Sequence, residues 1–204
     1  MNYKVFIKRN LFFVSCNKLK IKWGVNMLMN YLREGIITFL YLTPVAAIIL
    51  CAFIGIKFLL KRRFEFIPMK ILCEFGWILT VLAILKITGI IGGDFNTTSI
   101  LNGDVYFSYS IFQEGLSMAT LLNITLFIPF GFLSPIVFSE LQHKRIYGVL
   151  IGVIFSVVIE FLQTFTGRFV QLDDMLMNTL GTIIGYEIWI IISRIKSKPK
   201  LRVK

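Results

Sequence analysis

The sequence predicts an all-α integral membrane protein with about five transmembrane helices. Of its 204 residues, 56% are hydrophobic and only 16% are charged, and its mean hydropathy is +0.78. A soluble domain of this length does not need so large an apolar share. Several apolar runs also approach the roughly 20 residues that cross about 30 Å of hydrocarbon. These observations together favour a helical bundle embedded in a bilayer.

The charge pattern fits a membrane protein better than a nucleic-acid-binding one. The formal net charge is +11, and the basic residues occupy terminal segments and short loops between apolar runs. This distribution is typical of cytoplasmic loops and of contact with anionic lipids. The three cysteines, Cys16, Cys51 and Cys73, lack the spacing of a metal site. We therefore expect free thiols, no metal or other cofactor, and no nucleic-acid partner.

Residues 1–33 form a basic N-terminal segment ahead of the first apolar run. In residues 1–26, lysines and arginines interrupt the apolar residues too often for a spanning helix, so we expect an irregular segment without an export signal. A translation start at Met27 or Met29 would remove most of these cations. The codons for Lys22 to Asn26 permit a GGGGAG ribosome-binding sequence just upstream of Met27.

The first predicted span covers residues 35–60 and ends at the basic run 61–63. Pro44 inside this span predicts a kink, and Lys57 lies near enough to its end to extend toward the interface. Because the span has no charge in its central part, it is the clearest of the early segments. We place it at the start of a transmembrane domain that covers residues 34–193.

The second predicted span covers residues 70–91 and is weaker, because it carries Lys70, Glu74 and Lys86. Lys70 and Glu74 are four residues apart, so they would share one helix face. We expect these two side chains to pair near a membrane interface.

Residues 92–118 form the longest polar stretch of the chain. This stretch contains acidic residues but no lysine or arginine, which marks it as a loop outside the cell. Its aromatic side chains suit a segment that lies in the interface: Tyr106, Phe107, Tyr109 and Phe112. An outside loop here places residues 1–33 outside too, against the positive-inside rule. The alternative to a later start is that the basic segment stays inside and adds a re-entrant or sixth crossing.

Three further spans are predicted at 119–139, 146–166 and 172–193. The loop at 140–145 is short and basic, so it should lie inside. The chain then ends in a basic tail, residues 194–204, which we expect in the cytoplasm. Gly131, Gly181 and Gly185 are predicted to allow close helix packing.

Polar side chains recur at one depth in these three spans. Six of them are expected near the outer face, between the third, fourth and fifth helices: Asn123, Glu160, Gln163, Asp173, Asp174 and Asn178. Ionisable groups at the centre of a membrane helix cost about 2.5 to 3.5 kcal/mol on insertion scales. Such groups are usually retained for a function.

Arg168 lies on the turn between the fourth and fifth spans, where it would balance Glu160 or the aspartates. One interpretation makes the whole cluster an internal latch, because amides commonly join membrane helices. The other makes Glu160, Arg168 and Asp174 a functional site, since a latch does not need two acids and a base.

The region 119–190 resembles the VanZ-like family of small bacterial membrane proteins, which is named after a teicoplanin-resistance factor. Asn123 and the run Phe127 to Phe132 are similar to the family's N-x3-F-x-P-x-G-F motif, and Glu160 and Gln163 to its I-E-x-x-Q motif. The remaining matches are similar to its R-x-x-D-x-D-D-x3-N-x2-G-x3-G motif: Arg168, Asp173, Asp174, Asn178, Gly181 and Gly185. The chain departs from this pattern at Gln171, where the family usually has an aspartate. The earlier part of the chain matches only in general hydropathy.

The resemblance implies a multi-pass protein of the bacterial cell membrane, linked in some members to lowered teicoplanin susceptibility. We expect the outward polar cluster to engage membrane lipids, a cell-wall precursor or the lipoglycopeptide itself. One alternative is an enzyme that acts on a lipid head group, with Glu160 and Asp174 as acid and base and Arg168 binding phosphate. Another is a small transporter, although the chain shows no internal repeat.

Overall fold

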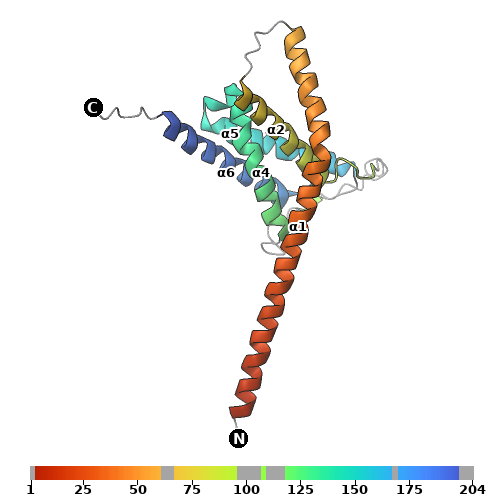
Figure 1. The fold of residues 1–204 in the computed structure, drawn as a ribbon, viewed down its shortest axis with the longest axis vertical. Coiled ribbons are helices and arrows are strands. Elements are labelled where there is room, and N and C mark those ends of the chain that lie inside the picture. Colours follow the sequence, from red (N-terminus) through yellow and green to blue (C-terminus); the bar gives the residue numbers. More distant parts are fainter. Residues whose placement is uncertain (1–2, 61–66, 96–106, 109–117, 167–169, 198–204) are drawn as a thin grey trace, which may run out of the picture. The chain divides into compact units, whose positions relative to one another are not determined.

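A computed structural model describes residues 3–60, 67–95, 107–108, 118–166 and 170–197 (Figure 1). Within these ranges the chain forms five α-helices, one short 3-10 helix and two two-residue strands. The helices are α1 (Tyr3–Leu59), α2 (Pro68–Ile87), α4 (Met118–Val137), α5 (Arg145–Thr164) and α6 (Leu172–Ser197). The shorter elements are β1 (Phe107–Ser108), η1 (Ser139–Gln142) and β2 (Val170–Gln171). The predicted all-α class is therefore confirmed.

Four of the described helices are long and apolar enough to cross a membrane, so the chain is a multi-pass membrane protein. Their apolar segments are Arg33–Leu59, Thr120–Val137, Arg145–Thr164 and Leu172–Ile195. These segments match the predicted first, third, fourth and fifth spans within a few residues. The predicted second span is the helix α2, which is not among the four.

The chain divides into two compact units, Met1–Tyr41 and Leu42–Lys204, and α1 contributes to both. The prediction that residues 1–26 are irregular is wrong, because α1 begins at Tyr3. Basic residues interrupt the apolar pattern there, but lysine and arginine are themselves good helix formers. The frequent basic residues of this segment argue against a membrane-spanning helix but are compatible with a helix as such.

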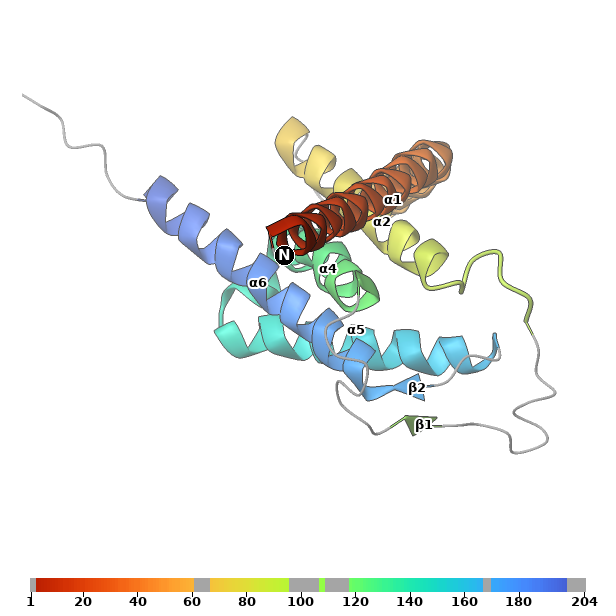
Figure 2. The same ribbon diagram turned by 90° about the horizontal axis from the view of Figure 1, so that it is seen from below.

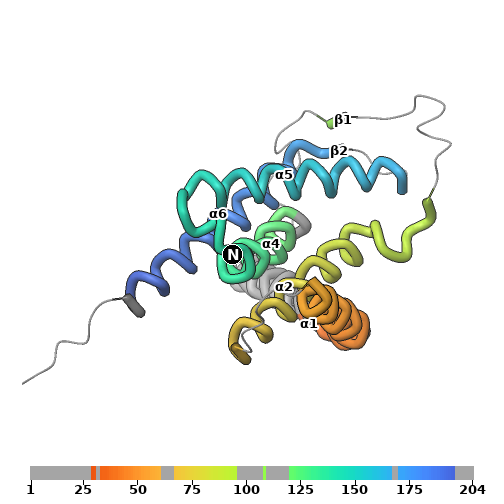
Figure 3. The backbone as a smooth tube through the Cα atoms, turned by 90° about the horizontal axis from the view of Figure 1, so that it is seen from above, coloured from red at the N-terminus to blue at the C-terminus, as the bar shows by residue number. Residues whose placement is uncertain are grey.

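In the second unit, α5 and α6 pack as an antiparallel pair, and α6 also runs alongside α4 (Figures 2 and 3). Gly148 near the start of α5 faces the ring of Tyr186, and Ser156 farther along α5 meets Asn178 nearer the start of α6. With the contact of Gly152 and Thr182 between them, these contacts recur at four-residue intervals, so one face of each helix forms the interface. A Cβ on Gly148 would lie 2.5 Å from Cγ of Tyr186, so this approach requires glycine.

Thr182 lies at the junction of the three helices α4, α5 and α6. A Cβ on Gly152 of α5 would lie 2.9 Å from Cβ of Thr182, and one on Gly131 of α4 would meet the Thr182 carbonyl group. Thr182 is fully buried, and its hydroxyl donates to a backbone carbonyl of its own helix. Small residues on two neighbouring helices therefore let α6 lie close to both.

The parallel helices α4 and α6 touch through their backbones. A Cβ on Gly181 would meet the carbonyl of Ile124, and one on Gly185 would meet the carbonyl of Ile128. Both obstacles are backbone atoms of α4, which cannot move aside as a flexible side chain can. The two glycines thus set the distance between these helices.

Aromatic side chains fill the interior between α2, α4 and α5. Phe130 is buried and stacks on Phe155 with ring centroids 4.4 Å apart, and Phe127 is fully buried beside them. Trp77 of α2 packs on Phe130 and donates from Nε1 to Oγ of Ser134 over 3.0 Å. The indole nitrogen is satisfied by this bond, so the ring can be buried without an orphaned donor.

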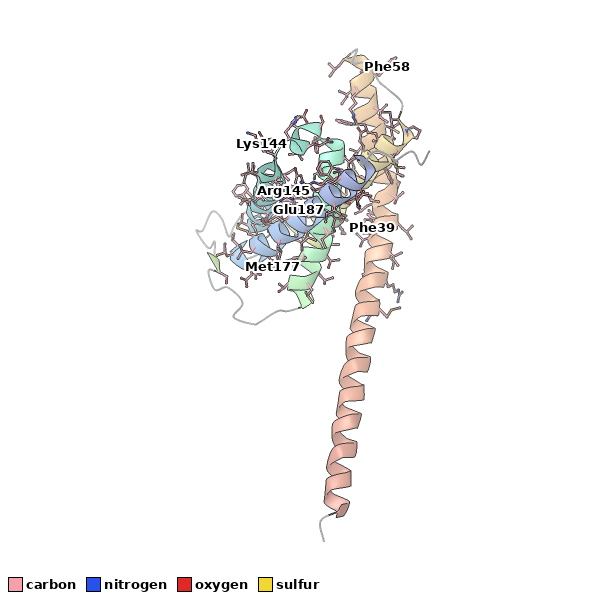
Figure 4. All side chains as sticks on the ribbon, turned by 90° about the vertical axis from the view of Figure 1, so that its left-hand side faces the viewer. Phe39, Phe58, Lys144, Arg145, Met177 and Glu187 are labelled. Atoms are coloured by element: carbon pink, nitrogen blue, oxygen red, sulfur yellow. The ribbon has the colours of Figure 1, made fainter. Side chains whose placement is uncertain are left out.

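The connection between α4 and α5 is tied to α6 by polar contacts. The Tyr186 hydroxyl donates to the backbone carbonyl of Leu141, and the carbonyl of Lys144 lies 3.2 Å away as a second acceptor. Nearby, Nη2 of Arg145 lies 3.3 Å from Oε2 of Glu187, on adjacent helices (Figure 4). This is the opposite end of α4 and α5 from Asn123 and Glu160.

The predicted pairing of Lys70 with Glu74 is wrong. Glu74 is 4% exposed, and its Oε1 accepts from Nζ of Lys57 over 3.0 Å. Lys70 is exposed on α2. A carboxylate buried at membrane depth is stabilised best by a cation that packing brings against it, and here α1 supplies that cation.

Candidate functional site

The polar residues meet at one end of the second unit, where α2 and α5 end and α4 and α6 begin. Nε2 of Gln163, at the end of α5, donates over 3.0 Å to the carbonyl of Thr88, which follows α2. At the same end β1 pairs with β2 in parallel register, Phe107 with Val170 and Ser108 with Gln171 (Figure 2). We use the term polar cluster for Asn123, Glu160, Gln163, Asp173, Asp174 and Asn178.

Asn123 and Asp174 join α4 to α6. Nδ2 of Asn123 donates to Oδ1 of Asp174 over 2.6 Å, and both side chains are half-buried. Asp174 lies in the first turn of α6, as does Asp173. The positive end of the helix dipole favours a carboxylate at both positions, which explains how two acids can be neighbours there.

Glu160 is the most deeply buried acid of the polar cluster. It is 1% exposed, and its Oε2 accepts from the backbone N–H of Gln171 over 3.0 Å. Gln171 is the position at which the VanZ-like pattern usually has an aspartate. In this chain the position contributes its backbone donor to Glu160 and, through β2, its pairing with β1.

Asn178 extends the polar cluster toward the bundle interior. It is 2% exposed, and its Nδ2 donates to Oγ of Ser156 over 3.2 Å. The Ser156 hydroxyl lies 3.4 Å from the carbonyl of Met175, which it can reach as a donor. Within the described part of the chain, Oδ1 of Asn178 has no hydrogen-bond partner. A buried acceptor of this kind can receive a hydrogen bond from a water molecule or a ligand.

The polar cluster therefore has an outer and an inner layer. Asn123, Asp173 and Asp174 are half-buried, whereas Glu160, Gln163 and Asn178 are buried. The side chains of the outer layer are partly exposed at the surface of the bundle. The inner layer is tied into the packing through hydrogen bonds to α6, to β2 and to the end of α2.

Arg168, the predicted counter-charge, lies outside the described residues, as do Tyr106, Tyr109 and Phe112 of the predicted aromatic segment. The predicted glycines Gly131, Gly181 and Gly185 all lie at the junctions of α6 with α4. These glycines hold together the two helices, α4 and α6, that carry part of the polar cluster.

Lys86 is a cation near the polar cluster that sequence reasoning did not connect with it. It lies in the last turn of α2 and is half-buried, and a Cβ on Gly92 would lie 2.7 Å from its Nζ. Among the described residues it has no ion-pair partner. The positive φ angles of Gly89 and Gly92 turn the chain back over it. The glycine-rich sequence after Lys86 signals this helix end.

Thr88 and Ser156 are two further polar contacts of the polar cluster. The carbonyl of Thr88 accepts from Gln163 of α5, which lies 75 residues later in the sequence. This contact therefore depends on tertiary packing. Ser156 shares a face with Glu160 and Gln163 at four- and three-residue spacing, and all three are buried. The helical period thus signals Ser156 but not Thr88.

The chemistry of the polar cluster is that of hydrogen-bond acceptors at membrane depth. Within the described ranges, no group of three or more His, Cys, Asp or Glu residues could hold a metal ion. Three carboxylates and a buried amide oxygen favour a partner that donates hydrogen bonds, such as a hydroxyl or an ammonium group. Lys86 adds a cation that suits a phosphate nearby.

Comparisons with known proteins identify one family. The sequence model of the family described as VanZ/LLP1 matches residues 38–193, which is most of the chain and includes every residue of the polar cluster. No curated protein and no solved structure matches the chain.

Proposed function

The chain belongs to the VanZ/LLP1 family, and from this premise we propose that its polar cluster engages an envelope lipid or cell-wall precursor at the outer face of a bacterial cell membrane. Through this contact the protein lowers susceptibility to teicoplanin-type lipoglycopeptides. The proposal treats the polar cluster as a binding site and the packed glycines as its support.

The contact between Asn123 and Asp174 carries the proposal. Their hydrogen bond of 2.6 Å joins two helices in a half-buried position, while Glu160 lies buried at the same end. Amides alone join membrane helices, so a latch gains little from the cost of two carboxylates. Acids kept at that depth support a role in recognition.

The proposed orientation follows from the segment that contains β1, the strand that pairs with β2 beside the polar cluster. Strand β1 belongs to the segment 92–118, which has no lysine or arginine, and it lies beside β2 next to the Glu160 contact. The positive-inside rule favours the outer side for such a segment. The polar cluster would then face outward, and the basic tail would lie in the cytoplasm.

The proposed contact uses both layers of the polar cluster. The half-buried Asp174 and Asn123 meet the head group, whereas the buried Glu160 holds β2 in place. Partial burial lowers the effective dielectric constant, so each polar contact to a head group is stronger than in water. Lys86 and Arg168 supply positive charge for a phosphate.

The test compares acid-to-amide substitutions with a packing defect. We expect Glu160→Gln and Asp174→Asn to keep the membrane level of the protein, because Gln and Asn can accept the same hydrogen bonds. Both should abolish teicoplanin protection in a sensitive Gram-positive host. Gly185→Leu should lower the protein level instead, since the added side chain meets the backbone of α4.

Two results would contradict the proposal. Full protection by both acid variants at the wild-type protein level would make their charge irrelevant. A loss of protein as large as that of Gly185→Leu would make the polar cluster a structural latch. A glycopeptide without a fatty-acyl chain serves as the drug control, since the proposed effect concerns lipoglycopeptides.

A further inference from the structure

A separate apolar pocket lies between α1, α2 and the end of α4, far along these helices from the polar cluster. Its volume is about 200 Å³. The lining side chains are Ile49 and Phe53 of α1, Trp77 and Ile78 of α2, and Val137 and Phe138 at the end of α4. Glu74 completes the lining.

The pocket wall offers apolar surface with almost no free hydrogen-bonding capacity. The Trp77 nitrogen is occupied by Ser134 at 3.0 Å, and the Trp77 ring packs edge-on against Phe138 with centroids 5.1 Å apart. Oε1 of Glu74 is taken by Lys57. An occupant must therefore be matched by shape and by apolar contact.

The pocket opens on the apolar surface of α1. Ile49 and Phe53 are 40% and 42% exposed on the surface of a helix that is long and apolar enough to span the bilayer. Hydrocarbon chains are thus the material that meets this opening. The helix α1 ends at Leu59, so Phe53 and Ile49 lie about 9 and 15 Å before this end of the helix.

Two lysines lie close to Glu74 of the pocket lining. Nζ of Lys57 lies 4.2 Å from the centroid of the Phe53 ring and is balanced by Glu74. Lys70 is exposed on α2, one turn before Glu74 and on the same helix face. With Lys57 paired to Glu74, Lys70 is the further cation next to this pair.

We propose that this pocket binds one acyl chain of an anionic phospholipid, whose head group is held by Lys70 beside the Lys57–Glu74 pair. The apolar lining selects hydrocarbon, and the excess cation selects a negative head group over a zwitterionic one. This lipid site is independent of the polar cluster, because it is built at the opposite end of α4.

Quenching of Trp77 fluorescence tests the site in the full-length protein. Trp23→Phe and Trp189→Phe leave Trp77 as the reporter on the pocket wall. The purified protein is titrated with phosphatidylglycerol or phosphatidylcholine that carry the same brominated acyl chains. We expect phosphatidylglycerol to quench at about fivefold lower concentration, which is the effect of one cation near an anionic head group.

Two substitutions separate the acyl chain from the head group. Val137→Phe should fill the pocket and strongly reduce quenching by both lipids, whereas Val153→Phe, on an exposed face of α5, should not. Lys70→Gln should keep the quenching and remove the preference for phosphatidylglycerol. Lys70 is exposed, so this change should not disturb folding.

The proposal fails if the two lipids quench the unsubstituted reporter protein equally, or if a folded Val137→Phe protein is quenched as before. If Val137→Phe does not fold, Ile49→Phe fills the pocket from the α1 wall and decides the same question. The preference of the reporter protein for phosphatidylglycerol tests the proposal even if neither Val137→Phe nor Ile49→Phe folds.

Discussion

Gly185→Ala should destabilise the bundle, because the added methyl group meets the backbone of α4. A Cβ at this position would press on the Ile128 carbonyl group and lie 2.7 Å from the backbone nitrogen of Phe132. Neither atom can rotate away, so α4 and α6 must separate. Overpacking of this kind costs about 3 kcal/mol at the upper end of its usual range.

Part of that cost is offset by helix propensity. Replacing glycine with alanine inside a helix favours the helical state by up to about 1 kcal/mol. The net loss at Gly185 should thus be about 2 kcal/mol. Gly55→Ala is the matched control, since a Cβ on Gly55 of α1 has no atom within 4 Å. The control substitution carries the propensity gain without the clash.

The free energy of unfolding, measured by titration with denaturing detergent in micelles, compares the two variants with the wild-type protein. We expect Gly55→Ala to unfold at the wild-type concentration or slightly above it, and Gly185→Ala clearly below it. Equal unfolding of Gly185→Ala and the wild type would refute the close approach of α4 and α6. A loss as large at Gly55 would show that alanine is harmful for another reason.

Three further predictions concern other parts of the chain. The first uses a protein whose native cysteines are replaced by serine. A cysteine introduced at Asp94 should react with a membrane-impermeant label in intact cells, whereas one at His143 should react only after permeabilisation. The reverse labelling pattern would overturn the proposed orientation. Lys57→Met should lower the free energy of unfolding by about 3 to 5 kcal/mol, because Glu74 is left buried without its counter-charge. Adding Glu74→Leu should restore most of this loss, and additive losses in the double variant would exclude the pair. Tyr186→Phe should lower the free energy of unfolding by about 1 kcal/mol, since the hydroxyl bonds to the segment before α5. If the same titration shows no loss, this hydroxyl does not stabilise the fold.

The apolar spans could be read from the sequence because bilayer thickness fixes the length of a spanning helix. Helices α4, α5 and α6 begin and end within a few residues of the predicted spans at 119–139, 146–166 and 172–193. The helical period likewise places Ser156, Glu160 and Gln163 on one face, where all three are buried. Local rules determine both features.

Contacts that depend on tertiary packing could not be obtained in this way. Glu74 had a plausible partner four residues away in Lys70, yet packing brings Lys57 of α1 against it. In the polar cluster, the bond from Gln163 to the carbonyl of Thr88 joins segments that no local pattern relates. The pairing of β1 with β2 was missed for the same reason, since two-residue strands leave no periodic signal.

The central claim is that the polar cluster holds an envelope lipid or cell-wall precursor, and the lipid that co-purifies with the protein tests it most directly. Mass spectrometry of the wild-type protein and of Glu160→Gln, purified in parallel from a bacterial membrane at equal yield, gives the two lipid inventories. We predict a specific lipid or precursor that is retained by the wild type and lost from Glu160→Gln, while the bulk phospholipids are unchanged in both. Identical inventories from two equally folded proteins would contradict the claim.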